Sequence, residues 1–167
     1  GSESVVAEGP WTGSTLPELI GRFGAELLGK ANYARFGQEF PLLVKFIDAR
    51  EDLSIQVHPD DELARKRHGK SGKCEMWYVL EAEPGASLLT GFSRPIAPAE
   101  YERRVADNTL TDVLNRQAIA SGDVFYLPAG RVHSIGKGSF IVEIQQSSDI
   151  TYRIYDFDRR DAAGNSR

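Results

Sequence analysis

Near the N-terminus, apolar residues recur at the three- and four-residue spacing of an amphipathic helix. Thr15 is a suitable N-cap, Pro17 lies in the first turn, and Gly29 is a suitable stop. The apolar positions are Leu16, Leu19, Ile20, Phe23, Leu27 and Leu28. The pattern predicts one helix over residues 16–28, after an extended lead-in over residues 1–15.

From Phe40 onward the pattern becomes typical of β-strands. Residues 42–49 form a largely apolar run that suits a buried strand, and residues 53–58 alternate with period two. Along this second strand, Leu53, Ile55 and Val57 share one face, and Ser54, Gln56 and His58 share the other. A polar face on a barrel strand either meets solvent or lines a pocket.

Short segments separated by Gly and Pro turns make up the rest of the chain. Residues 76–80 and 86–90 are expected to pair as strands around a Pro84-Gly85 turn, and Asp60 opens a short charged helix that Gly69 and Gly72 end. Further helices are predicted over residues 98–105 and 111–116, and further strands over residues 118–119, 124–127, 140–144 and 151–157. The pattern predicts an all-β barrel with short helical insertions.

The composition narrows the classes of function. A chain of 167 residues fits one domain with a proper core, and its net charge of -4 argues against general nucleic-acid binding. The single cysteine, Cys74, excludes an intrachain disulfide framework and suits the reducing cytoplasm. No apolar run reaches about 18 residues, so no membrane span is expected, and no signal-peptide pattern is expected at the start.

One turn motif and one strand offer candidate metal ligands. Gly122 permits a sharp turn into a strand, Pro128 and Gly130 shape the hairpin that follows, and His133 then points into the barrel. Upstream, Gln56 and His58 lie two apart on one strand face, and Glu75 begins the next apolar run. Two imidazoles, a carboxylate and an amide oxygen suit one zinc-like ion with an open coordination position. The alternatives are an incidental surface histidine and a solvent-facing polar strand.

The turn motif resembles the second conserved motif of the cupin superfamily. Four blocks in order resemble the type I mannose-6-phosphate isomerases: residues 53–61, 72–80, 128–133 and 144–158. The resemblance covers most of the chain and implies a cupin-type jelly-roll barrel. It also implies one Zn²⁺ per chain, held by Gln56, His58, Glu75 and His133.

The resemblance assigns roles to five more residues. Lys45 and Ser54 match residues on the side of the substrate phosphate, and Lys73 matches a lysine proposed to assist proton transfer. Arg153 matches an active-site arginine near the reacting sugar carbons, and Glu143 matches an acidic residue of the pocket. Each also has a structural explanation: Lys45 as a snorkelling strand residue, Ser54 as a strand hydroxyl, Glu143 as an ion-pair partner, and Arg153 stacked between tyrosines. Cys74 is expected to be an inhibitor-sensitive thiol rather than a nucleophile.

The activity implied is the isomerisation of mannose 6-phosphate to fructose 6-phosphate through an enediol-like intermediate. The identity of the base, Lys73 or Glu143, stays open at this stage. The alternatives are a non-catalytic cupin that binds sugar phosphates, or another metal-dependent cupin such as a dioxygenase or an epimerase. Iron oxygenases use two histidines and one carboxylate, so Gln56 as a fourth ligand counts against a dioxygenase.

The expected organisation has three parts. Residues 1–38 form the lead-in and helix, residues 39–160 form the catalytic cupin barrel, and residues 161–167 form a polar tail. Members of the resembled family carry an additional N-terminal strand segment and a second β-domain. The chain is therefore expected to be the central catalytic portion of a longer enzyme.

Overall fold

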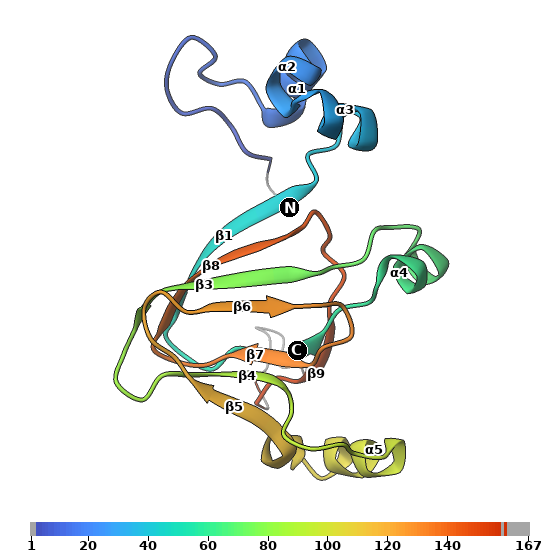
Figure 1. Cartoon of the computed structure of the whole chain (residues 1–167), viewed down its shortest axis with the longest axis vertical. Helices are drawn as coiled ribbons and strands as arrows, with labels where there is room; N and C mark the ends of the chain where they lie inside the picture. Colours follow the sequence, from blue (N-terminus) through green and yellow to red (C-terminus); the bar gives the residue numbers. More distant parts are fainter. Residues whose placement is uncertain (1–2, 158, 160–167) are drawn as a thin grey trace. The chain divides into compact units, whose positions relative to one another are not determined.

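The computed structural model describes residues 3–157 and 159, so the predicted tail over residues 161–167 lies outside the described residues. The chain divides into two compact units, residues 1–42 and residues 43–167 (Figure 1). Within the described residues, no helix combines the length and the apolar character needed to cross a membrane.

The first unit contains three short helices in place of the single predicted one: α1 (Leu16–Phe23), α2 (Ala25–Leu28) and α3 (Lys30–Phe36). The predicted N-cap is confirmed, since Thr15 and Glu18 form a reciprocal capping box at the start of α1. The prediction of one continuous helix was wrong because Gly24 has a φ of +49°, which breaks the helical path after Phe23. Helix α3 was not predicted.

The second unit contains two antiparallel sheets, which confirm the all-β, cupin-type fold with short helices. In the four-stranded sheet the order is β1 (Leu42–Ala49), β8 (Ser139–Gln146), β3 (Glu75–Ala82) and β6 (Val124–Leu127). In the five-stranded sheet the order is β5 (Leu114–Ala118), β4 (Ser87–Phe92), β7 (His133–Ile135), β2 (Ile55–Val57) and β9 (Tyr152–Tyr155).

Two predicted strand pairings were wrong. Strands β3 and β4 flank the Pro84-Gly85 turn, but β3 pairs with β6 and β8 whereas β4 pairs with β5 and β7. The turn around Pro128 and Gly130 likewise joins β6 of one sheet to β7 of the other, so it is a crossover and not a hairpin. In both cases the turn carries the chain between sheets, because strands that belong to opposite walls of a sandwich cannot pair with each other.

The core lies between the two sheets. Its buried side chains are Ala49, Trp77, Val79, Leu88, Leu127, Ile135 and Ile141. A second cluster covers the other face of the five-stranded sheet, beneath α5 (Pro98–Ala106) and the 3-10 helix η1 (Leu110–Val113). The predicted helix over residues 111–116 was partly wrong. The 3-10 helix ends at Val113, and strand β5 starts at Leu114. The charged helix was confirmed as α4 (Asp61–His68).

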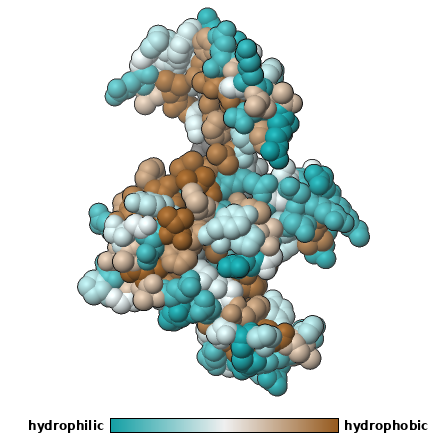
Figure 2. Space-filling view, viewed as in Figure 1, coloured by the Kyte–Doolittle hydropathy of each residue, from teal (hydrophilic) through white to brown (hydrophobic). Residues whose placement is uncertain are grey.

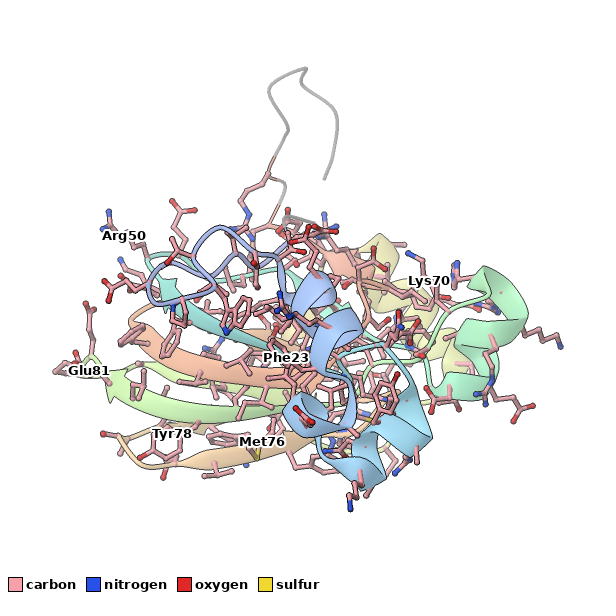
Figure 3. The ribbon with its side chains drawn as sticks, turned by 90° about the horizontal axis from the view of Figure 1, so that it is seen from above. Phe23, Arg50, Lys70, Met76, Tyr78 and Glu81 are labelled. Carbon is pink, nitrogen blue, oxygen red and sulfur yellow. The ribbon has the colours of Figure 1, made fainter. Side chains whose placement is uncertain are left out.

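The outer face of the four-stranded sheet is apolar. Residues of β3 alternate, so Trp77 enters the core while Met76 and Tyr78 project together on the opposite side (Figure 3). Phe46 of β1 is 70% exposed, and hydrophobic residues gather over the strands of this sheet (Figure 2). The inner face of the same sheet carries the polar residues described next.

Candidate metal centre and active site

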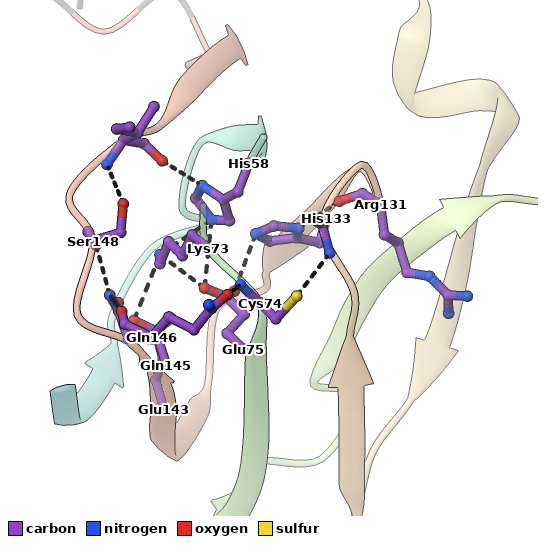
Figure 4. Close-up of polar contacts among 12 residues, drawn as sticks. His58, Lys73, Cys74, Glu75, Arg131, His133, Glu143, Gln145, Gln146 and Ser148 are labelled. Carbon is purple, nitrogen blue, oxygen red and sulfur yellow. Dashed lines mark hydrogen bonds and ion pairs between the residues drawn. The ribbon is translucent and has the colours of Figure 1, made fainter. Parts of the chain in front are cut away.

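Three predicted ligands converge at one end of the two sheets. Glu75 begins β3, His133 begins β7, and His58 directly follows β2. Each residue is at most 2% exposed. His133 Nε2 lies 3.1 Å from Glu75 Oε1, and His58 Nε2 lies 3.4 Å from Glu75 Oε2. One ligand atom from each residue fits within 4.8 Å of the other two, so the three side chains can bind a single ion (Figure 4).

Backbone carbonyls fix the orientation of both imidazoles. His58 Nδ1 lies 2.9 Å from Ile150 O, and His133 Nδ1 lies 2.7 Å from Arg131 O. A carbonyl oxygen only accepts, so each Nδ1 carries the proton and donates. In the neutral imidazole, the lone pair of each Nε2 then points toward the carboxylate of Glu75, which is the arrangement that metal-binding histidines adopt.

The carboxylate of Glu75 is ionised in this setting. Burial raises its pKa, but the adjacent side chains of His133 and His58 and the positive charge of Lys73 outweigh burial, so the pKa lies well below its usual range. Among residues 3–157 and 159, both oxygens of Glu75 and Nε2 of His133 are buried without a hydrogen-bond partner of good geometry. Buried acceptors in this state are costly. The ammonium of Lys73 forms an ion pair with Glu75 Oε2, and a bound cation would compensate Glu75 Oε1 and His133 Nε2.

A second group of charged residues lies beside the three ligands. Lys73 is buried, and its Nζ lies 2.8 Å from Glu75 Oε2 and 3.1 Å from His58 Nε2. Glu143 Oε1 lies 4.0 Å from Lys73 Nζ and accepts a hydrogen bond of 2.8 Å from Lys45. Trp77 Nε1 donates to Glu143 Oε2 over 3.2 Å. The structure thus brings together three residues that the sequence assigned separately to phosphate binding and proton transfer: Lys45, Lys73 and Glu143.

Gln56, Arg153 and Ser54 line a cavity of 490 Å³. In strand register, Gln56 lies opposite His133 on one side and opposite Arg153 on the other. Paired residues of antiparallel strands project to the same face, so the side chains of Gln56 and Arg153 share the face that carries His133. Ser54 and Lys45 were expected to act together, but Lys45 is not among the residues that line this cavity.

Sequence reasoning left several residues of this region without a role. Asp156 and Arg159 form an ion pair at the wall of the cavity, and Gln145 is fully buried beside Glu143. Gln145 and Asp156 lie in the block over residues 144–158 that carried the family resemblance, which was the available signal, and Arg159 lies just beyond it. Cys74 is a free thiol whose Sγ accepts a hydrogen bond of 3.4 Å from the backbone N–H of Ala129. His68 is exposed on α4.

Comparison with known proteins gives a family match. Residues 2–93 match the family model for the type I phosphomannose isomerase catalytic domain. A mannose-6-phosphate isomerase of Streptococcus mutans is 42% identical over 98% of this chain, and ManA of Bacillus subtilis is 41% identical over 99%. The chain spans about half the length of these relatives, 50% and 51% respectively.

Solved structures give the same result. The crystal structure of mannose 6-phosphate isomerase from Bacillus subtilis aligns with a TM-score of 0.87 and 38% identity, covering 99% of this chain and 51% of that chain. Structures of the phosphomannose isomerase from Salmonella typhimurium, at 17% identity and a TM-score of 0.67, share the fold. The family match covers more than half of the chain and includes His58 and Glu75, so the chain belongs to the type I phosphomannose isomerase catalytic domain family.

Proposed function

We propose that this chain carries the active site of a metal-dependent isomerase that interconverts mannose 6-phosphate and fructose 6-phosphate. The observation that carries the proposal is the convergence of His58, Glu75 and His133 in a chain of this family, where Glu75 Oε1 and His133 Nε2 are buried and find no hydrogen-bond donor among the described residues. The dioxygenase, epimerase and non-catalytic alternatives have less support, because the relatives covering nearly the whole chain are named mannose-6-phosphate isomerases.

The proposed cofactor is one Zn²⁺, held by His58, Glu75 and His133, with Gln56 as the fourth ligand. Two imidazole nitrogens and one carboxylate suit zinc, and a ligand set of this kind can leave a coordination position for substrate. A bound divalent ion polarises sugar oxygens or orders a catalytic water. The register of Gln56 with His133 supports its inclusion.

Proton transfer between sugar carbons C2 and C1 is the chemical problem of the reaction. Lys73 and Glu143 are the candidates to hold and move this proton, and their charged atoms lie 4.0 Å apart. Arg153 lines the cavity with Gln56, so its guanidinium can stabilise the negative charge that develops on the enediolate oxygen.

Ser54 and Lys45 are the residues that bind the substrate phosphate in this proposal. Ser54 shares its cavity with Arg153, and the side chain of Lys45 is 41% exposed, so its ammonium retains access to solvent while bound to Glu143. Binding energy from the phosphate, remote from the reacting carbons, then orients the sugar. A reducing compartment such as the cytoplasm suits the free thiol of Cys74.

A coupled assay with mannose 6-phosphate, with and without EDTA, tests the activity. With the chain in a protein of the full length of its relatives, we expect turnover that EDTA abolishes and Zn²⁺ restores. Metal analysis of His58→Ala tests the ligand set, and His68→Ala is the matched control, because His68 is exposed and bonds only to the hydroxyl of Tyr152 among the contacts described. Loss of the ion in His58→Ala alone supports the assignment, whereas equal metal content in both variants contradicts it.

A further inference from the structure

Gln145 has a buried side-chain amide whose oxygen and NH₂ group all form hydrogen bonds. It lies on the inward face of β8 and is 1% exposed. Its Oε1 accepts from Lys45 Nζ over 2.5 Å, and its Nε2 donates to Gln146 O and Ser148 O, each over 2.8 Å. The two carbonyls only accept, so the NH₂ group must face them and the oxygen must face Lys45.

The chemistry of the amide matters for Lys45. Glu143 already supplies one carboxylate to the ammonium of Lys45, and Gln145 supplies a second acceptor without a second negative charge. Two of the three N–H groups of the ammonium are thereby fixed in direction, and the third is left free for the open side of a half-exposed lysine. The ammonium is thus held in place by two acceptors, of which only Glu143 carries a negative charge.

The segment that Gln145 holds also supports the metal centre (Figure 4). Gln146 exchanges hydrogen bonds with the backbone of Cys74, beside Glu75, over 2.7 Å and 3.1 Å. Ile150 O accepts from Nδ1 of His58 over 2.9 Å. Residues 145–150 therefore connect His58 and the backbone next to Glu75 with Lys45, and within this segment Gln145 contacts Lys45.

We propose that Gln145 is a positioning residue that aims the ammonium of Lys45 for the isomerisation. The proposal rests on the proposed function and assigns Gln145 no contact with the substrate. It acts by holding Lys45 at a fixed place relative to Glu143 and the turn over residues 145–150, since a lysine held by one partner only can adopt several rotamers.

A double-mutant cycle tests the proposal. Gln145→Met, Lys45→Met and the double variant are compared in the mannose 6-phosphate assay, with metal content and thermal melting recorded for each. We expect Gln145→Met to lower kcat/KM about 10- to 100-fold with the metal retained. In the Lys45→Met background the same substitution should have almost no further effect, because its target is gone. Additive losses in the two backgrounds would overturn the proposal.

Gln146→Met is the matched control, because Gln146 lies in the same turn and binds Cys74 instead of Lys45. Its effect should add to that of Lys45→Met. A general loosening of the turn would instead give Gln145→Met and Gln146→Met the same additive pattern.

A second measurement is independent of isomerase activity. The rate at which an amine-reactive anhydride labels Lys45 is followed by mass spectrometry in wild type and in Gln145→Met. We expect faster labelling of Lys45 in the variant, with unchanged labelling of the exposed Lys137. Equal rates at Lys45 contradict the positioning role. An inactive wild type with faster labelling of Lys45 would remove the proposed function and leave the positioning role standing.

Discussion

The position of Arg153 suits it to stabilise negative charge that develops on the substrate. It lies on β9, in register with Gln56, and lines the same 490 Å³ cavity. A strand fixes the backbone of the arginine, so its planar guanidinium can be presented rigidly to a developing oxyanion. Ser54, on the same cavity wall, offers only a hydroxyl and is expected to affect binding of the phosphate.

Arg153→Ala should lower kcat by about 100-fold or more, because electrostatic stabilisation of an enediolate contributes several kcal/mol. Metal content should stay normal and KM should change less. Arg153→Lys should also be impaired, since a point charge does not reproduce the guanidinium plane. Steady-state kinetics and metal analysis check this, and a wild-type kcat in Arg153→Ala would remove the residue from the mechanism.

Lys45 belongs to the binding of the substrate in the proposed function. Lys45→Ala should raise the apparent KM for mannose 6-phosphate while zinc content stays at the wild-type level, because the ammonium bonds to Glu143 and Gln145, which are not among the four predicted ligands. Kinetics with metal analysis measure both quantities. An unchanged KM would exclude Lys45 from substrate binding and leave it only a structural ion pair with Glu143.

At the scale of elements, helix α4 and the loop that follows it set the approach of Lys73 to the metal centre. Asp60 caps α4 by accepting from Leu63 N over 2.8 Å, and Gly72 packs against the backbone at this same helix start. A Cβ on Gly72 would lie 2.4 Å from the carbonyl carbon of Asp60. Lys73 N also donates to Pro59 O over 3.0 Å, so the loop has little room to shift.

Gly72→Ala should therefore destabilise the fold by about 1–3 kcal/mol, the cost typical of overpacking. The matched control is Gly21→Ala in the interior of α1, where a Cβ meets no atom within 4 Å. This variant should stabilise the chain by about 0.5–1 kcal/mol, because alanine favours a helix interior over glycine. Denaturant unfolding measures both, and a tolerated Gly72→Ala would mean that the loop adjusts freely.

Helix α5 carries a pH-dependent contact at its first turn. Hydrogen bonds from Arg94 and Arg104 lower the pKa of Glu100 from 4.5 to about 2. A depressed carboxyl pKa stabilises the folded state above pH 4.5 and loses that contribution as the pH falls through about 2. In an NMR titration, Arg94→Ala should move the pKa of Glu100 back toward 4.5. A pKa that stays near 2 in the variant would assign the shift to Arg104 alone.

At the scale of the whole molecule, the two faces of the four-stranded sheet have opposite characters. The inner face carries Trp77 and the polar groups of the site, and the outer face carries exposed apolar side chains such as Phe46, Val124 and Tyr126. The packing that stabilises the fold therefore lies on the inner side of this sheet. The outer side chains contribute little, because they keep much of their exposure after folding.

Phe46→Ser and Val124→Thr should each change the free energy of unfolding by less than about 0.5 kcal/mol. Trp77→Ala should cost about 3–5 kcal/mol, because it empties the core and also removes the donor to Glu143. Chemical denaturation of the three variants provides the comparison. A large loss in Phe46→Ser would show that the outer face is packed in solution.

The sequence by itself determined the fold class, most of the strands and the candidate metal-binding cluster of His58, Glu75 and His133. These depend on local signals, since period-two alternation sets which side chains share a face and the Pro128-x-Gly130 turn sets where His133 begins its strand. Only the tertiary structure decided which sheet each strand joins, because turns that look like hairpins here cross between sheets. It also decided that Lys45 meets Gln145, 100 residues away along the chain. A glutamine in an apolar strand carries no local mark of its partner, because only the pairing of β1 with β8 brings the two side chains together.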